Sequence, residues 1–414
     1  MTIARDVPCR EGRHRLRTTR FNSGIHRTIL AVMHYRHFPK IADREVSALG
    51  FGCMRLPTLG KDPAAIDEPA FDAMLVAAAE SGVNYLDTAY VYHNGRSESA
   101  LGAALDRTGL RDRFTLATKS PVWLAKDRGD WDRFLDEQLG RLRAERIDFY
   151  LLHALGRERW DRVRRLGALE ALQQAKADGR IGHIGFSFHD SLDAFKEIID
   201  GFPGWEFCQV QFNYVDTDYQ AGREGIAYAA ARSIGVIVME PLRGGALANP
   251  PPAVRALLSR HPTPRTGSEW ALRFVLDRQE VVTALSGMGT ASQIRDNAAV
   301  ADAARPNALL TEELSLLAEA RAAYRSRLRV PCTTCGYCMP CPNGVDIPGV
   351  FGQANGASMF ETLEGTGAWY ASAFVKGGTS GDNCVRCGEC LPKCPQHIEI
   401  PDRLEESHRY LMRS

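Results

Sequence analysis

The run Ile147-Asp148-Phe149-Tyr150-Leu151-Leu152-His153 has the composition of a short buried strand, because it is mostly apolar and aromatic. Seven further runs of this kind lie between Ser47 and Ala304, and longer stretches with helical spacing of apolar residues separate them. The predicted strands are residues 48–52, 85–89, 114–119, 147–153, 183–188, 207–213, 235–240 and 281–286. This alternation predicts repeated strand-helix units and a parallel sheet.

The stretches between the strands carry the spacing of helices that face a core. One of them has apolar residues at i, i+3, i+4 and i+7, namely Phe71, Met74, Leu75 and Ala78, and ends at Ser81-Gly82. Eight such units in about 250 residues favour a (β/α)8 TIM barrel over an open doubly wound sheet. An open sheet would carry a Gly-rich phosphate loop after its first strand, and residues 50–53 resemble one only weakly. The expected fold class is therefore α/β, with a TIM barrel over residues 33–304.

Eight of the eleven cysteines form two quartets near the end of the sequence, each followed by a proline. The first is Cys332, Cys335, Cys338 and Cys341, and the second is Cys384, Cys387, Cys390 and Cys394. The second has the C-x2-C-x2-C-x3-C-P spacing of bacterial ferredoxins, and the first has two residues before its last cysteine instead of three. Three closely spaced thiolates can bind one cubane, whereas the fourth points away and can serve the other cluster. The quartets predict two [4Fe-4S] clusters in a small, largely helical, ferredoxin-like iron-sulfur domain over residues 331–414.

Zinc and disulfides are the alternative uses of these cysteines. Structural zinc sites also use C-x2-C pairs, but they combine one pair with two distant ligands. Disulfides are typical of secreted proteins, and the sequence shows no secretory signal. Air-sensitive clusters also need a reducing compartment, so we expect a cytoplasmic protein.

Two further segments complete the expected organisation. Residues 1–32 are rich in arginine and lack apolar periodicity, which predicts a disordered extension or a start assigned too early, with a transit peptide as the alternative. Residues 305–330 predict a linker helix that leaves the barrel, with Leu314, Leu317, Ala318 and Tyr324 on one side.

The charge and hydropathy of the chain argue against two classes of partner. Its 51 basic and 50 acidic side chains give a net charge of +1, so no basic face for nucleic acid is expected. No apolar run approaches the roughly 20 residues that cross a bilayer. The sequence therefore predicts a soluble globular protein that binds neither nucleic acid nor a membrane.

Four polar residues lie at or just after predicted strand ends. Asp87, Lys119 and His153 each close a strand, and Tyr92 follows on the loop after Asp87. Because the carboxyl ends of all barrel strands meet on one face, residues more than thirty positions apart would converge there. Each residue alone also has an ordinary structural explanation, such as a buried ion pair or a histidine bonded at a strand end. The combination favours a catalytic site.

Such a cluster suits the transfer of hydride to a carbonyl group. The carbonyl oxygen needs a proton donor, and a phenol with its ordinary pKa near 10 is a weak acid unless its phenolate is stabilised. Lys119 can supply the positive charge, and Asp87 can hold the ammonium in place. His153 can orient the carbonyl oxygen and share its developing charge.

These strand ends resemble the aldo/keto reductase family. The resemblance is carried by Leu86-Asp87-Thr88-Ala89-Tyr90-Val91-Tyr92, by Gly95 and Ser97-Glu98, by Ala117-Thr118-Lys119 and by Leu151-Leu152-His153, and it covers residues 33–304. Residues 33–36 and 46–57, together with the trailing cysteines, resemble the ferredoxin-tailed branch of that family. The family implies NAD(P)(H)-dependent interconversion of a small-molecule carbonyl substrate and its alcohol. It implies Tyr92 as general acid/base, Lys119 and Asp87 as the residues that tune it, and His153 as the residue that polarises the substrate.

The resemblance also implies where NADP or NAD binds, extended across the barrel mouth. The cofactor-binding residues that it implies are Gly52, Cys53, Met54, Asp87, Ser187, Gln209, Met239, Pro241, Leu242, Gly244, Gly287, Met288, Gly289, Gln293 and Asn297. Two positions depart from the family pattern: Phe188 replaces an asparagine, and Met239 replaces an aromatic ring. Residues 287–293 also lack the lysine and arginine that NADP-preferring members direct at the 2′-phosphate, and Arg295 is the nearest cation in the sequence. NAD and NADP therefore both stay in the prediction.

The sequence admits three uses of the clusters. A nicotinamide passes two electrons as a hydride, a [4Fe-4S] cluster passes one at a time, and no flavin-binding signature is present to connect them. The first hypothesis is a carbonyl oxidoreductase whose two clusters exchange electrons with an electron-transfer protein. The second is the same reductase with structural or redox-sensing clusters. The third is a nucleotide-binding regulatory protein with little turnover.

Overall fold

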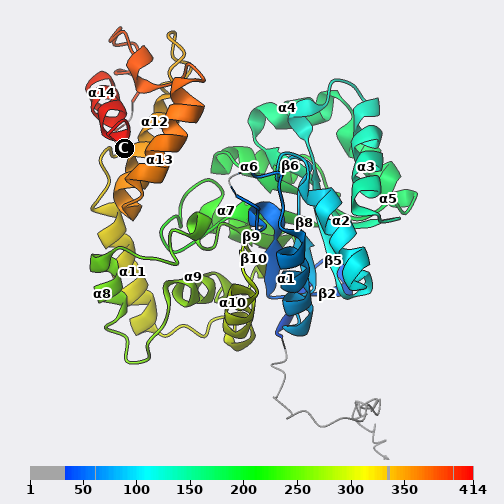
Figure 1. Ribbon diagram of the computed structural model, residues 1–414. Coiled ribbons are helices and arrows are strands. Elements are labelled where there is room, and N and C mark those ends of the chain that lie inside the picture. Colours follow the sequence, from blue (N-terminus) through cyan, green and yellow to red (C-terminus); the bar gives the residue numbers. More distant parts are fainter. Residues whose placement is uncertain (1–32, 61, 333–335, 395, 414) are drawn as a thin grey trace, which may run out of the picture. The chain divides into compact units, whose positions relative to one another are not determined.

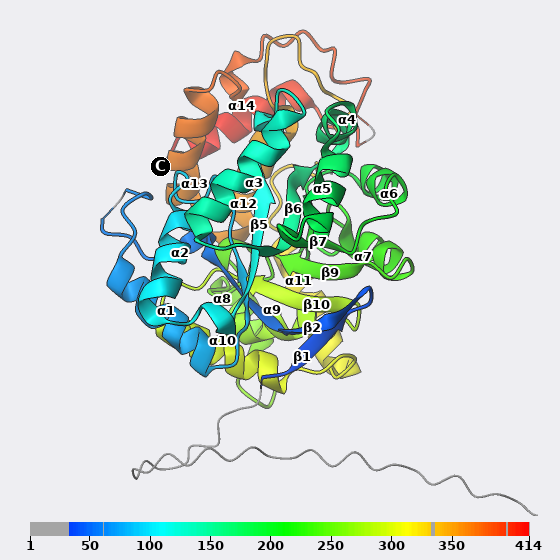
Figure 2. The same cartoon turned by 90° about the vertical axis from the view of Figure 1, so that its right-hand side faces the viewer.

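The eight apolar runs of the sequence form the eight parallel strands of a closed barrel, in the order β10-β3-β4-β5-β6-β7-β8-β9. The computed structural model describes residues 33–60, 62–332, 336–394 and 396–413. The predicted extension 1–32 and Cys335 lie outside these described residues. Figures 1 and 2 show the strands at the centre and the helices around them. This arrangement confirms the predicted α/β fold class with a (β/α)8 TIM barrel.

The strand bounds lie within a few residues of the predicted ones. The barrel strands are β3 (Leu49–Gly52), β4 (Tyr85–Asp87), β5 (Thr115–Ser120), β6 (Ile147–Leu155), β7 (Ile181–Phe188), β8 (Phe207–Gln211), β9 (Gly235–Met239) and β10 (Val281–Ser286). The helices of this part are α1 (Glu68–Glu80), α2 (Ser97–Thr108), α3 (Gly129–Leu142), α4 (Arg157–Arg165), α5 (Ala168–Ala177), α6 (Leu192–Asp200), α7 (Gly222–Ala230), α8 (Pro252–Leu258), α9 (Gly267–Leu276) and α10 (Ala291–Ala303).

Helix α1 illustrates how the local sequence sets these elements. The Asp67 side chain accepts a hydrogen bond from the Ala70 backbone N–H, and Pro69 lies in the first turn, where its missing N–H costs nothing. The apolar positions predicted to face the core are buried. The helix ends at Ser81, and Gly82 follows with φ of 78°, a left-handed conformation that glycine adopts without strain.

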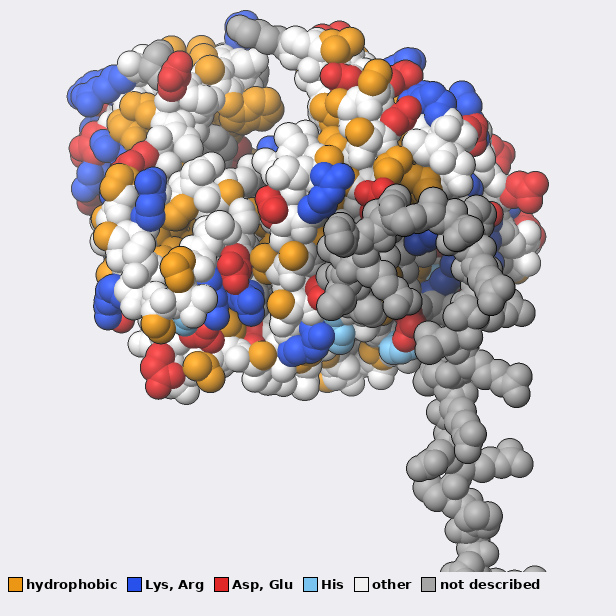
Figure 3. Space-filling model, turned by 60° about the horizontal axis from the view of Figure 1, so that its bottom comes forward, with side chains coloured by type: hydrophobic (Ala, Val, Ile, Leu, Met, Phe, Trp, Pro, Cys, Tyr) orange, Lys and Arg blue, Asp and Glu red, His pale blue; other side chains and the backbone are white. Residues whose placement is uncertain are grey.

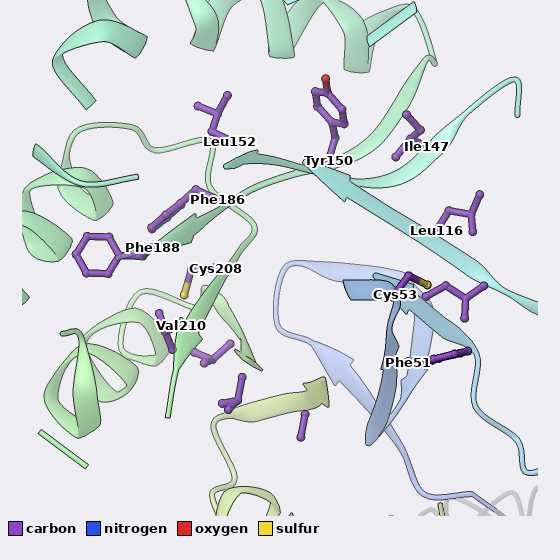
Figure 4. Packing of buried hydrophobic residues seen from close by; sticks show 14 of the residues in the cluster. Phe51, Cys53, Leu116, Ile147, Tyr150, Leu152, Phe186, Phe188, Cys208 and Val210 are labelled. Atoms are coloured by element: carbon purple, nitrogen blue, oxygen red, sulfur yellow. The ribbon is translucent and has the colours of Figure 1, made fainter. Parts of the chain in front are cut away.

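The largest apolar core fills the space between the strands and the helices. Figure 4 shows side chains of this core, among them Phe51, Leu116, Tyr150 and Phe186. Because successive strand residues point to opposite faces, the residues between these side chains point into the barrel. The outward side chains therefore anchor the helices, whereas inward ones such as Phe149 and Leu151 fill the barrel, and only those near the carboxyl ends of the strands line the mouth.

An antiparallel hairpin that the sequence analysis did not predict closes the other end of the barrel. It consists of β1 (Tyr35–Phe38) and β2 (Ile41–Ser47). The Phe38 ring packs against Phe149 and Phe207, with centroid distances of 5.0 Å and 5.9 Å. A Cβ atom on Gly235 would lie 2.2 Å from Phe38, so glycine is required for this approach. Since Phe207 and Gly235 are the first residues of their strands, the hairpin covers the amino ends.

The segment after the barrel is helical. It contains α11 (Thr311–Arg325), α12 (Ile347–Phe360), α13 (Leu363–Tyr370), a π-helical turn (Ala371–Val375) and α14 (Ile400–Leu411). Helix α11 is shorter than the predicted 305–330, and of the four residues predicted on one side Leu317 and Tyr324 are buried, whereas Leu314 and Ala318 are exposed. Leu314 is 42% exposed, whereas Leu316, Leu317, Ala320 and Tyr324 pack with α8 and α9. The linker helix therefore packs against the barrel helices and does not leave them.

The surface of the described residues mixes both signs of charge. Figure 3 shows basic and acidic side chains interspersed on one face of the molecule. Within the described residues, no helix is both long enough and apolar enough to cross a bilayer.

The hairpin contact generates a stability prediction. The substitution Phe38→Ala removes a ring that is 2% exposed and leaves a cavity against Phe149 and Phe207, so the free energy of unfolding should fall by about 3–5 kcal/mol. Denaturant unfolding followed by tryptophan fluorescence measures the change.

The matched control for this prediction is His37→Ala, one residue away on the solvent side of the same strand. Its side chain is 62% exposed and pairs only with exposed Glu45, so the expected change stays within about 0.5 kcal/mol. If the two substitutions lower the free energy of unfolding equally, packing of the Phe38 ring against the barrel does not stabilise the protein.

Candidate active site

The four residues predicted to be catalytic meet at the carboxyl ends of three neighbouring strands. Asp87 ends β4, Lys119 lies near the end of β5, His153 lies near the end of β6, and Tyr92 follows β4 on its loop. Lys119 Nζ donates to Asp87 Oδ1 at 2.6 Å, to the Thr88 carbonyl at 2.7 Å and to the Tyr92 hydroxyl at 3.3 Å. The Tyr92 and His153 rings lie with centroids 6.1 Å apart. The geometric condition for the predicted catalytic cluster is thus met.

Burial controls the electrostatics of this cluster. The side chains of Lys119 and Asp87 are 1% and 4% exposed. Burial disfavours the charge on Lys119, but Asp87 and Tyr92 together raise its pKa above the ordinary value. Burial raises the pKa of Tyr92, and the adjacent Lys119 ammonium opposes that rise. Lys119 therefore stays protonated and favours the phenolate form of Tyr92 over what burial alone would allow.

His153 is held in its neutral form. Burial, with the positive charge of Lys119 as a further cause, lowers the pKa of His153 well below its ordinary value. Its Nδ1 atom is buried and has no hydrogen-bond partner among the described residues. The Trp123 ring packs against the imidazole with a centroid distance of 5.2 Å. A neutral imidazole has one N–H donor, which suits hydrogen bonding to a substrate oxygen.

A cavity of about 280 Å³ opens above these residues. Of the predicted cofactor-binding residues, ten line it: Gly52, Met54, Asp87, Ser187, Gln209, Met239, Pro241, Leu242, Gly244 and Gly287. Tyr92, Lys119 and His153 line the same cavity. Three of the predicted catalytic residues besides Asp87 and ten of the predicted cofactor residues, Asp87 included, therefore share one space at the barrel mouth.

Five predicted cofactor residues do not line this cavity. The Cys53 thiol lies within the apolar core, as Figure 4 shows, and Met288 is 1% exposed in the same core. Gly289 donates its backbone N–H to Gln293 Oε1, and both residues are exposed. Asn297 Nδ2 donates to the hydroxyl of Ser286, which does line the cavity. These residues can contact a nucleotide in the cavity only through their backbone or through a neighbour.

Several cavity residues were not predicted as cofactor-binding. Arg55, Glu240, Leu285 and Ser286 also line the cavity. Most of them are direct neighbours of predicted residues at strand ends, which is the only signal that the sequence offered. Arg55 differs, because its long side chain reaches across to Glu240 with an Nη2 to Oε1 distance of 4.0 Å.

The polar groups of the cavity fit the carboxamide of a nicotinamide. Gln209 Oε1 is buried and has no hydrogen-bond partner among the described residues, so it can accept from an amide N–H. The Ser187 hydroxyl accepts from the Ala154 backbone N–H and keeps its own proton to donate. Phe188 points away and packs against Phe195 in the core, with a centroid distance of 5.0 Å. The family's asparagine position therefore supplies no cavity group in this chain.

The cysteines of the two quartets meet around two small cavities. One is lined by Cys338 and Cys341 of the first quartet together with Cys384, Cys387 and Cys390 of the second. The other is lined by Cys332 and Cys338 of the first quartet together with Cys394 of the second. Each fourth cysteine thus lies with the other quartet, as the ferredoxin spacing predicted.

The thiol environment suits a shared prosthetic group. Burial raises the pKa of Cys390, and the nearby Cys384, Cys387 and Cys341 raise it further, so the neighbouring thiols oppose the ionisation of Cys390. A group that withdraws thiolate charge would relieve this opposition. Among the described residues, no three Cys, His, Asp or Glu side chains lie close enough together to hold a single metal ion.

Comparison with known proteins agrees with this geometry. The Aldo/keto reductase family model matches residues 48–308, and a 4Fe-4S dicluster domain matches residues 331–399. An uncharacterized oxidoreductase of Schizosaccharomyces pombe is 28% identical over 62% of this chain and 82% of its own length. Methylglyoxal reductase YeaE of Escherichia coli is 27% identical over 67% of this chain and 95% of its own.

A solved structure agrees as well. The holo form of an aldo-keto reductase from Bacillus halodurans is 27% identical, covers 70% of this chain and 96% of its own, and superimposes with a TM-score of 0.58. The matched family region spans the barrel and its mouth, and the dicluster domain spans both cysteine quartets. The chain belongs to the aldo/keto reductase family and is an oxidoreductase in which a 4Fe-4S dicluster domain follows the barrel.

Proposed function

We propose that this protein interconverts a small carbonyl compound and its alcohol with NADP or NAD, with Tyr92 as the general acid/base. The observation that carries the proposal is the position of Lys119 Nζ, which reaches Asp87 and Tyr92 at once inside the cavity. A lysine in this position has one effect on the neighbouring phenol, which is to stabilise its deprotonated form. That is the property that a proton donor to a developing alkoxide requires.

The reaction divides among the residues of the cavity. The bound reduced nicotinamide supplies the hydride. Tyr92 donates its phenolic proton to the substrate oxygen, and Lys119 stabilises the phenolate that is left. Asp87 keeps the ammonium in place, and neutral His153 orients the carbonyl oxygen by a hydrogen bond. In the oxidation direction the Tyr92 phenolate accepts the proton from the alcohol.

Ser187 and Gln209 support binding of the nicotinamide end of the cofactor. Their polar groups face the cavity, and Gln209 Oε1 has no protein partner among the described residues. Arg295, the cation nearest the expected 2′-phosphate site, is 59% exposed and lies 4.0 Å from Glu80. The proposal therefore includes both NADP and NAD.

For the cysteine domain we propose two [4Fe-4S] clusters that exchange electrons with a partner protein in the cytoplasm. One cluster would use Cys332, Cys335, Cys338 and Cys394, and the other Cys384, Cys387, Cys390 and Cys341. Cys387 is exposed, which favours transfer to an external partner. The second candidate is a structural or redox-sensing role, because six of the cysteines also pack against the apolar core of this domain.

The acid/base assignment predicts the effect of Tyr92→Phe. This substitution removes the phenolic proton and keeps the ring, so kcat for carbonyl reduction should fall about 10²–10⁴-fold while NAD(P)H still binds. Steady-state oxidation of NAD(P)H with a panel of aldehydes and ketones measures the rate, and fluorescence titration measures binding.

Tyr90→Phe provides the matched control for this loss. The Tyr90 hydroxyl donates to Glu137 Oε2 at 2.5 Å on the side of α3 and does not line the cavity. Turnover of Tyr90→Phe should equal that of the wild type. Unchanged turnover in Tyr92→Phe would contradict the acid/base assignment.

The role of Lys119 predicts a shift in pH dependence. Alcohol oxidation needs the Tyr92 phenolate, so its rate rises as pH increases through the pKa of Tyr92. Because Lys119 opposes the rise in that pKa, Lys119→Met should shift the pH-dependent increase in oxidation rate to higher pH. The oxidation rate at neutral pH should therefore fall. Lys126→Met, at an exposed lysine, should leave the profile unchanged. If the oxidation rate of Lys119→Met rises over the same pH range as that of the wild type, Lys119 does not lower the pKa of Tyr92.

If the fourth cysteine of each quartet binds the cluster of the other quartet, substitutions of two ligands to the same cluster should have the same effect. Anaerobically purified protein should contain about eight iron and eight sulfide per chain, as two [4Fe-4S] clusters require. Cys341→Ala should lose the same paramagnetic resonance signal as Cys384→Ala, and Cys394→Ala the same signal as Cys332→Ala. Cys208→Ala, in the barrel core, should retain full iron. If Cys341→Ala instead resembles Cys332→Ala, each quartet binds its own cluster.

A further inference from the structure

The strand that carries His153 is irregular at that residue. The pairing of β6 with β7 shifts register between Leu152 and Leu155. Within this bulge Ala154 has φ of 54°, a left-handed conformation that an alanine rarely adopts. Bulges of this kind redirect a side chain, and strained backbone persists only where the surroundings hold it. The direction of the His153 imidazole therefore depends on whatever fixes Ala154.

Two side chains hold the backbone of Ala154. Its N–H donates to the Ser187 hydroxyl at 2.7 Å, and its carbonyl accepts from Arg159 Nη1 at 2.7 Å. Ser187 is on β7, and Arg159 is in the first turns of α4. Both polar groups of the strained residue are thus satisfied by side chains and not by the sheet.

Arg159 also supports the other side of His153. Its guanidinium lies over the Trp123 ring, 5.1 Å from the centroid, and the same ring packs against the imidazole. One guanidinium therefore donates to the Ala154 carbonyl and also lies over the Trp123 ring, a combination that the more compact lysine ammonium is poorly suited to reproduce. No carboxylate of the described residues forms an ion pair with Arg159.

We infer that Arg159 is a positioning residue for His153, acting by holding the strained Ala154 turn and the Trp123 ring that together fix the imidazole. The inference rests on the proposed function, in which His153 orients the carbonyl oxygen. Arg159 is absent from the lining of the cavity, so it acts through His153 and does not touch the reacting atoms.

The test compares Arg159→Ala and Arg159→Lys with a control on the same helix. Arg157→Ala removes an arginine whose side chain is 56% exposed and whose ion pair is with Glu197. Displacement of His153 should lower kcat by up to about 100-fold in Arg159→Ala, with nucleotide affinity and iron content unchanged. Arg159→Lys should stay well below the wild type, and Arg157→Ala should match it. Equal turnover in Arg159→Ala and Arg157→Ala, together with unmoved imidazole signals of His153, would overturn the inference.

A double-mutant cycle separates positioning from direct action. In a His153→Ala background, Arg159→Ala should cause no further loss of kcat, because its effect passes through the imidazole. A loss that multiplies with that of His153→Ala would show that Arg159 acts on the substrate by another route, and would overturn the inference.

The final measurement does not depend on turnover. In protein with isotope-labelled histidine, the imidazole signals of His153 and their pH titration report its surroundings directly, where Lys119, His189, Tyr92 and Arg159 are the ionisable groups nearby. Arg159→Ala should move these signals, and Arg157→Ala should not. Moved signals with unchanged turnover would support positioning and count against the proposed role of His153. Unmoved signals would overturn the positioning itself.

Discussion

The buried ion pair between Lys119 and Asp87 is the interaction around which the candidate site is organised. A lysine ammonium has three N–H donors, and all three are used, by Asp87, the Thr88 carbonyl and Tyr92. Such complete satisfaction is what makes a buried charge tolerable in a low-dielectric interior. It also fixes the phenol, since Tyr92 can bond to the ammonium only from one direction. The Lys119 Nζ atom therefore supplies the positive charge beside the phenol and also fixes the position of the Tyr92 hydroxyl.

A second buried charge stabilises the strand that carries Lys119. Glu98 is fully buried and accepts from Thr118 Oγ1 at 2.6 Å and from Gln138 Nε2 at 2.5 Å, while Arg141 pairs with its other oxygen at 3.2 Å. Gln138 also donates to the backbone carbonyl of Lys119 at 3.1 Å. This network connects α2 and α3 to β5. The hydrogen bond from Gln138 to the Lys119 carbonyl restricts movement of the Lys119 backbone.

The sequence predicted the fold and the convergence of the site well, because both follow from where strands end. It predicted side-chain direction less well. Cys53 and Met288 were predicted as cofactor contacts without a side-chain direction, and both side chains face the core. The predicted face of α11 was right for Leu317 and Tyr324, which are buried, and wrong for Leu314, which is exposed. The hairpin was missed because β2 is largely polar and exposed along its length, and only the long-range contact of Phe38 reveals the role of the two strands.

The same hairpin limits how ligands can enter and leave the barrel. With the amino ends of the strands sealed by Phe38 and its neighbours, the described cavity lies at the opposite rim. Nucleotide and carbonyl compound would then both enter and leave through the opening of this cavity. Whichever molecule occupies the inner floor, beside Ser187 and Gln209, would have to arrive before its companion and depart after it. Under the proposed function, the closed amino end of the barrel thus predicts that the two ligands bind and leave in a fixed order.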